Sequence, residues 1–173
     1  MRALVIWESA FGNTRKIAES IAEGLAPTVT ATTAEAGRLD AGLLDGIDLL
    51  VVGAPTHMFG LPSARSRQNE IQQVRGEWQP AAGGVREWLA AAPPVGRRTV
   101  VAAAFDTRFA KPHWVTGSAA RATAKQLKDL GYRVVATESF FVARAEGPLL
   151  RGEFERAHGW AEGLAATLTS VSS

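Results

Sequence analysis

A buried strand that runs through a short turn directly into a helix is the feature that most constrains the fold of this chain. Ala3-Leu4-Val5-Ile6 is an unbroken apolar run, which is typical of a strand buried on both faces. A helix is predicted after it, because apolar residues recur at helical spacing, at Ile17, Ala18, Ile21, Ala22 and Leu25. Such a strand and helix are typical of a domain in which helices cover a parallel sheet.

The turn between the two, Trp7-Glu8-Ser9-Ala10-Phe11-Gly12-Asn13-Thr14, predicts an anion site. The first N–H groups of a helix have no partner inside the helix, and they attract negative charge. Ser9, Asn13 and Thr14 add side-chain donors at the same place. We therefore expect this turn to hold a phosphate group. The alternative is a strand, turn and helix that bind no ligand.

The glycine and lysine residues of the chain argue against two common kinds of phosphate site. A dinucleotide-binding turn needs three glycines, whereas this turn has only Gly12, and the chain has no Gly-Lys-Ser or Gly-Lys-Thr triplet of the Walker type. The segment Ser9-Ala10-Phe11-Gly12-Asn13-Thr14 instead resembles the phosphate loop of flavodoxins, commonly Thr-x-Thr-Gly-Asn-Thr. This resemblance implies that FMN binds, with its 5′-phosphate held by backbone amides and hydroxyls of these residues. Phe11 stands where a hydroxyl is usual, so one donor, which contributes about 1.5–3 kcal/mol, is missing.

A second informative stretch follows the buried strand predicted at residues 48–54, which stops at Pro55. Gly53-Ala54-Pro55-Thr56 resembles the Gly-x-Pro-Thr loop that flanks the isoalloxazine ring in several flavodoxin-like families. The resemblance implies that Thr56 and His57 offer backbone groups to the ring and that Met58 or Phe59 packs on it. It also makes Gly60 the hinge at which a peptide flips on reduction. The usual stacking tryptophan is absent here, and the alternative is a turn that merely leaves the strand.

A third stretch, Phe105-Asp106-Thr107-Arg108, ends the strand predicted at residues 98–105. Ligands of doubly wound sheets bind outside the carboxyl ends of the strands, where the loops after strands one, three and four converge. The resemblance implies that this stretch contacts the pyrimidine side of the ring, with Asp106 accepting from the flavin N3–H. Arg108 would lie near N1 and O2, where a cation favours the anionic reduced flavin. The alternative is an Asp106–Arg108 pair that only shapes the turn.

The rest of the chain completes an alternation of strands and helices. Further strands are expected at 28–32 and at 132–142, the latter long or split, and helices at 118–130 and 154–168. The buried stripe of the last helix is expected to comprise Phe154, Ala157, Ala161, Leu164, Ala165 and Leu168. Residues 61–94 form an extended connection, with a polar helix at 63–74 and a short amphipathic one near Trp88. This connection is a lid, a dimer surface or a solvated insertion rich in arginine.

Five strands that alternate with helices predict an α/β fold with a parallel sheet. The resemblance to flavodoxins adds the architecture, a three-layer α/β/α sandwich with a five-stranded sheet in the order 2-1-3-4-5. At 173 residues and 46% hydrophobic content, the chain fits a single flavodoxin-like domain over residues 1–173.

Composition argues against several other classes of function. The formal net charge of +2 does not indicate a nucleic-acid partner, although the pI near 9.4 contrasts with the acidic character usual in electron-carrying flavodoxins. The chain has no cysteine, which excludes disulfides, thiolate nucleophiles and iron–sulfur clusters. Its histidines, His57, His113 and His158, show no metal-ligand spacing.

The location of the protein is also predicted from the sequence. The chain starts with a core strand rather than a signal peptide, and no apolar run approaches the ~18 residues of a membrane helix. We therefore expect a cytoplasmic protein without a membrane span.

Three functions agree with these patterns. The first is an FMN-binding electron carrier that serves redox partner proteins. The second is an FMN-dependent oxidoreductase akin to the NAD(P)H:quinone reductases, in which His57 or Arg108 assists hydride transfer. The third is a flavodoxin-shaped binding module without cofactor. The compact architecture favours the carrier, whereas the weak positive charge and the connection at 61–94 favour the reductase. A homodimer is an alternative to a monomer, with the dimer surface in that connection.

Overall fold

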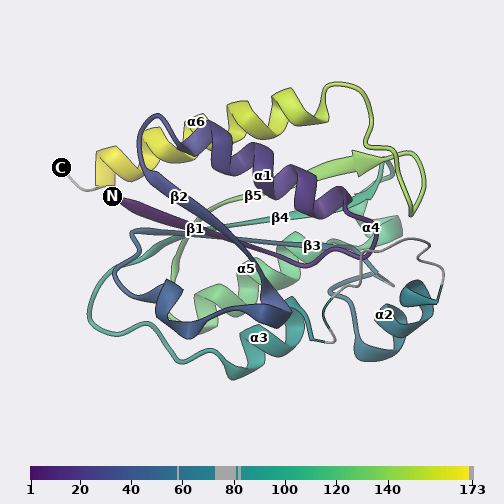
Figure 1. Ribbon diagram of the computed structural model, residues 1–173, viewed down its shortest axis with the longest axis horizontal. Coiled ribbons are helices and arrows are strands. Elements are labelled where there is room, and N and C mark those ends of the chain that lie inside the picture. Colours follow the sequence, from purple (N-terminus) through teal and green to yellow (C-terminus); the bar gives the residue numbers. More distant parts are fainter. Residues whose placement is uncertain (58, 73–80, 82, 172–173) are drawn as a thin grey trace.

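Five parallel strands form one sheet in the computed structural model, which describes residues 1–57, 59–72, 81 and 83–171. The order is β2-β1-β3-β4-β5, as the resemblance implied, so the predicted fold class is confirmed (Figure 1). The strands are β1 (Arg2–Trp7), β2 (Thr30–Glu35), β3 (Leu49–Pro55), β4 (Val101–Phe109) and β5 (Arg133–Val142). Because all strands are parallel, their carboxyl ends lie along one edge of the sheet, at the right of Figure 1.

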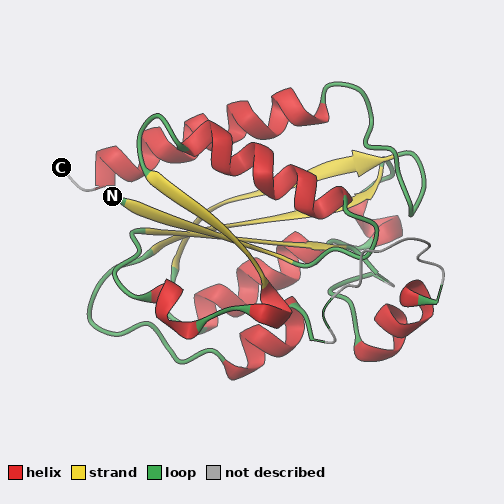
Figure 2. Cartoon of the chain, in the orientation of Figure 1, coloured by secondary structure: helices red, strands yellow, loops and turns green. Residues whose placement is uncertain are grey.

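Helices cover both faces of the sheet and give the three layers (Figure 2). One face carries α1 (Asn13–Leu25) and α6 (Glu153–Val171), and the other carries α3 (Val85–Ala91) and α5 (Ala119–Asp129). Two short helices, α2 (Ala64–Ile71) and α4 (His113–Thr116), lie beside the carboxyl ends of the strands. Between β2 and β3 the chain makes 3-10 turns at Ala36–Arg38 and Ala41–Leu44. No helix in the described ranges combines the length and the apolarity that a bilayer span demands.

The central strands are buried on both faces because their side chains alternate between two apolar cores. Val5 and Val51 pack toward α1 and α6, whereas their neighbours Leu4 and Leu50 pack toward α3 and α5. Phe105, Phe140 and Trp160 form an edge-to-face aromatic cluster with centroid distances of 6.1–6.5 Å. This cluster gives Trp160 of α6 a packing role against the sheet.

Some predicted boundaries were wrong. β4 extends to Phe109 because it pairs with β3 and β5 beyond Phe105, so Asp106, Thr107 and Arg108 belong to the strand rather than to a loop. β5 is one long strand with a single irregularity in its pairing, which agrees with the unsplit alternative. Phe154 is 44% exposed and does not join the buried stripe of α6.

A buried ion pair joins α2 to the sheet and to α3. The side chain of Arg67 is only 4% exposed, and its Nε donates to Glu8 Oε1 at 2.7 Å, at the end of β1. Its Nη2 donates to Glu87 Oε2 at 2.9 Å, and the other Glu8 oxygen accepts from the Val85 N–H at 2.9 Å. Arg67 therefore anchors α2 to the rest of the fold. This differs from the alternative in which residues 61–94 are a solvated insertion rich in arginine.

This network shifts the pKa of the Glu87 carboxyl. Burial raises the pKa of its carboxyl, but the N–H groups of Gly84 and of Glu87 itself and the Arg67 guanidinium lower it, and the net effect is a pKa below the ordinary value. A carboxyl with a lowered pKa in the folded state stabilises the fold above its ordinary pKa. That stabilisation is lost as the pH falls through the lowered value.

Two helical glycines give opposite predictions for the same substitution. A Cβ on Gly24 would lie 2.5 Å from the His158 carbonyl oxygen of α6, so Gly24→Ala should lower the free energy of unfolding by about 1–3 kcal/mol despite the better helix propensity. A Cβ on Gly163 would have no neighbouring atom within 4 Å. Gly163→Ala should therefore raise the free energy of unfolding by about 0.5–1 kcal/mol. Urea unfolding measures both, and equal effects would contradict the close α1–α6 packing.

Glu87→Gln should lower the free energy of unfolding by about 1 kcal/mol at pH 7, because the half-exposed ion pair with Arg67 loses its charge. The difference from the wild type should shrink as the pH falls through the lowered pKa of Glu87, because the protonated carboxyl is then as uncharged as the glutamine side chain. The exposed Glu23→Gln is the control and should change stability by less than about 0.5 kcal/mol. A Glu87→Gln effect that persists in acid would mean that packing, not charge, is responsible.

Candidate functional site

A cleft of about 300 Å³ opens at the carboxyl ends of β1, β3 and β4. It brings the three predicted stretches together, as expected for a doubly wound sheet. The predicted residues that line it are Ser9, Ala10, Phe11, Asn13, Thr14, Pro55, Thr56, His57, Thr107 and Arg108. Residues that the sequence reasoning missed also line it, and they are Ser66, Asn69, Glu70, Phe109, Val142 and Ala145.

The turn between β1 and α1 forms a cradle of uncharged donors. Gly12 caps the helix at φ +88°, a left-handed conformation that glycine adopts without strain, and its N–H donates to Ser9 Oγ at 2.9 Å. The Thr14 hydroxyl lies 2.7 Å from that of Thr107 on β4. With the N–H groups of the first turn of α1, these hydroxyls suit a phosphate oxyanion, so the residues present fit the phosphate of FMN.

The carboxylate that is adjacent to this cradle in the sequence is bound by other groups of the protein. Glu8 precedes Ser9, yet both Glu8 oxygens are occupied by Arg67 and by the Val85 N–H. This arrangement matters because an unpaired carboxylate beside the cradle would repel an anion. Phe11 is the residue that departs from the flavodoxin motif. It is half-buried and lines the cleft at a position where a hydroxyl is usual.

The segment after β3 forms a tight turn. His57 and Gly60 exchange two backbone hydrogen bonds of 2.8 Å each. Phe59, next to Gly60, has a left-handed backbone conformation at φ +74°, and its side chain is 68% exposed. The peptide flip expected at Gly60 stays a prediction. Neither Phe59 nor Gly60 is among the residues that line the cleft, and Met58 lies outside the described residues.

The side chain of His57 lies between a hydroxyl and a carboxylate of α2. Its Nδ1 is 3.0 Å from Ser66 Oγ, and its Nε2 is 2.8 Å from Glu70 Oε1. The sequence contained a signal for this contact, because Ser66 and Glu70 are four residues apart on a predicted helix and therefore share one face. What it lacked was the position of that helix relative to His57.

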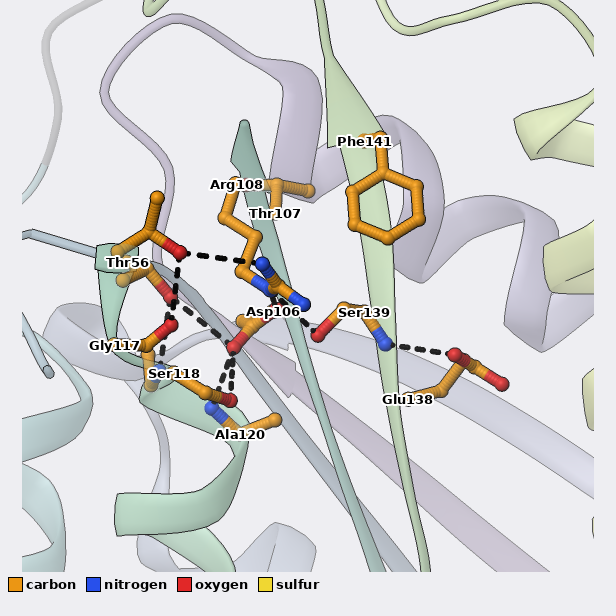
Figure 3. A network of polar contacts seen from close by, with 12 residues as sticks. Thr56, Asp106, Thr107, Arg108, Gly117, Ser118, Ala120, Glu138, Ser139 and Phe141 are labelled. Carbon is orange, nitrogen blue, oxygen red and sulfur yellow. Dashed lines mark hydrogen bonds and ion pairs between the residues drawn. The ribbon is translucent and has the colours of Figure 1, made fainter. Parts of the chain in front are cut away.

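Asp106 is fully buried and is not among the residues that line the cleft. Its carboxylate is bonded to the start of α5 (Figure 3). Its Oδ2 accepts from the Ser118 hydroxyl at 2.6 Å, from the Ala120 N–H at 3.0 Å and from the Thr56 hydroxyl at 3.1 Å. The expected contact with a flavin N3–H does not agree with this placement. The placement agrees with the alternative of an Asp106–Arg108 pair, because Asp106 Oδ1 lies within ion-pair distance of the Arg108 guanidinium.

Arg108 lines the cleft, but its guanidinium is held by the protein (Figure 3). Its Nε donates to Ser139 Oγ at 3.0 Å and lies 3.7 Å from Asp106 Oδ1, and its Nη1 donates to the Thr116 hydroxyl at 3.2 Å. Phe105, which was also expected at the ring, is fully buried in the aromatic cluster and does not line the cleft.

Comparison with solved structures shows the same fold in several proteins. A flavodoxin from the domain Archaea has 15% identity and a TM-score of 0.65, with 98% of this chain and 99% of that chain covered. The flavodoxin of Streptococcus pneumoniae TIGR4 has 18% identity and a TM-score of 0.66, with 96% and 99% covered. The flavodiiron protein of Giardia intestinalis has 15% identity and a TM-score of 0.61, and 98% of this chain matches 36% of it.

The family is shown by the sequence itself. No curated protein matches the chain, but the family model described as flavodoxin matches residues 5–163, nearly the whole length. That range contains the cradle, the turn after β3 and the end of β4. FMN is the cofactor of this family, and the donor set of the cradle fits its phosphate. The chain belongs to the flavodoxin family.

Proposed function

We propose that this protein binds FMN in the cleft and carries electrons between redox partner proteins. The observation that supports the proposal most is the cradle of uncharged donors at the start of α1, which opens into the same cleft as the turn after β3. When bound, FMN supplies the redox chemistry, and the protein supplies position and electrostatics. The proposal also includes that the chain forms a single domain and that the protein is located in the cytoplasm.

In this proposal the residues of the cleft divide into two groups. Ser9, Asn13 and Thr14 bind the phosphate with side-chain and backbone donors, joined by the backbone N–H groups of Ala10 and Phe11. Gly12 shapes the turn that presents them, since its own N–H donates to Ser9 Oγ. The segment Pro55–His57 and the pair Thr107–Arg108 surround the ring, because they line the same cleft at neighbouring strand ends. Residues 64–71 of the extended connection form a wall of the site rather than a lid.

A second candidate function is an FMN-dependent oxidoreductase of the NAD(P)H:quinone type. His57 and Glu70 favour it, since an imidazole beside a carboxylate can hold and release protons near a reacting group. Homodimer formation stays a prediction for either candidate.

The test begins with the absorption spectrum of the purified protein before and after FMN is added. Bound FMN and quenched FMN fluorescence are expected, whereas a protein that neither carries nor quenches FMN would leave only the module without cofactor. The loaded protein is then mixed with NADH or NADPH and a quinone. Absence of turnover supports the carrier, and rapid bleaching with turnover supports the reductase.

Thr14→Ala should weaken FMN binding by about 1–3 kcal/mol, which is about 5- to 150-fold in Kd, because a phosphate donor is lost. Thr14→Ser retains the hydroxyl and should bind within a few fold of the wild type. Thr167→Ala, on the exposed side of α6, is the control for loss of a threonine elsewhere. Fluorescence titration measures the three constants, and equal affinity of Thr14→Ala and wild type would place the phosphate elsewhere.

Phe11→Thr should tighten FMN binding, because it restores the hydroxyl that the flavodoxin motif has at this position. One added hydrogen bond corresponds to about 0.5–1.5 kcal/mol, or about 2- to 12-fold in Kd. Phe11→Ala removes the phenyl ring without adding a hydroxyl, so it serves as the control. It should not tighten FMN binding to the same extent. A Phe11→Thr variant that binds no better than Phe11→Ala would show that this position does not reach the phosphate.

A further inference from the structure

We propose that His57 is a redox-linked proton site, which binds a proton at Nδ1 when electrons enter the cofactor cleft. This inference rests on the proposed function, since it requires FMN in the cleft. It differs from the role of a hydride-transfer residue, because the proton stays on the protein and no substrate is involved.

The first support is that His57 is enclosed by fixed polar partners. Its side chain is 9% exposed, and both ring nitrogens face side chains of α2. Glu70 Oε1 lies 2.8 Å from Nε2, and Glu70 Oε2 is buried without a hydrogen-bond donor among the described residues. The Nε2–Oε1 contact is electrostatic, because its geometry is not that of a hydrogen bond. It therefore becomes more favourable when the imidazole is charged.

The positions of the partners identify the atom that gains the proton. The Glu70 carboxylate 2.8 Å away disfavours a bare lone pair on Nε2 and favours a hydrogen there, so we assign the hydrogen of the neutral ring to Nε2. Nδ1 is then the free acceptor, and it accepts from the Ser66 hydroxyl at 3.0 Å. The additional proton of the imidazolium consequently goes to Nδ1.

Ser66 can satisfy both protonation states without movement of heavy atoms. When Nδ1 is bare, the Ser66 hydroxyl donates to it. When Nδ1 carries a proton, it donates to Ser66 Oγ, and the Ser66 hydrogen turns to the Ser63 carbonyl, which is 3.2 Å away. Ser66 Oγ also accepts from the Ser63 N–H at 2.9 Å, which fixes its position. This role at the first turn of α2 argues against Ser66 as a nucleophile.

The charges around His57 favour coupling to the redox state. Glu70 faces it from α2, and Arg108 of β4 lines the same cleft above the buried Asp106. Glu8 and Arg67 line a smaller pocket together with Pro55 and Glu70, and they pair with each other. Glu70 is thus the carboxylate that acts on the ring, and negative charge added to the cleft favours the imidazolium further. The step moves one proton from solvent to Nδ1, while a redox partner protein supplies the electrons.

The test is a potentiometric titration of the FMN-loaded protein, reduced with dithionite at pH values from about 5 to 9, around the range in which histidine titrates. The wild type should bind more protons per two electrons than His57→Gln, so its midpoint potential should vary more steeply with pH. His158→Gln, which removes an exposed histidine of α6, should behave as the wild type. Equal pH dependence of the wild type and His57→Gln would overturn the proposal.

Two further measurements separate proton binding from a structural effect. Ser66→Thr retains the hydroxyl and should retain the additional proton, whereas Ser66→Ala should lose it. Nitrogen-15 NMR of the wild type should show the His57 Nδ1 resonance move to that of a protonated nitrogen on reduction, and a resonance that does not move would contradict the proposal without any variant. Failure to bind FMN would overturn the proposed function as well, whereas FMN binding without the linked proton would overturn this inference alone.

Discussion

Burial of the central strands on both faces is the constraint on which the site depends. Val5, Val51 and Ala103 have no exposed surface, and the layers of helices cover both faces of the sheet around them. Polar side chains of these strands can therefore reach a ligand only where the strands end. Parallel pairing places those ends on one edge, and this brings the hydroxyls of Thr14 and Thr107 together from distant parts of the chain.

The carboxylates near the cleft have separate partners, and this separation explains how a neutral cradle can coexist with acidic neighbours. Glu8 is bound by Arg67, and Asp106 is bound by the start of α5. Neither is free to repel an anion in the cleft. Glu70 differs, because its partner is the imidazole of His57 rather than a guanidinium or a helix start. The same helix, α2, thus anchors itself through Arg67 and presents Glu70 to the site.

The sequence predicted the fold well because apolar runs and helical periodicity are local signals, and it located the cleft because parallel strand ends must meet. It did not predict the burial of Asp106, since pairing with β5 extends β4 past Phe105 and no local pattern shows that pairing. It also missed the contact of His57 with Ser66 and Glu70, because the position of α2 is set by the distant ion pair of Arg67.

The central claim is that uncharged donors at the start of α1 hold a phosphate dianion, and phosphorus-31 NMR of bound FMN tests it most directly. A phosphate enclosed by amide and hydroxyl donors should have a shifted resonance that stays constant with pH through about 6, where a free phosphate monoester takes up its second proton. A bound phosphate that titrates as it does in free FMN would contradict the account, because it would show that the group lies in solvent.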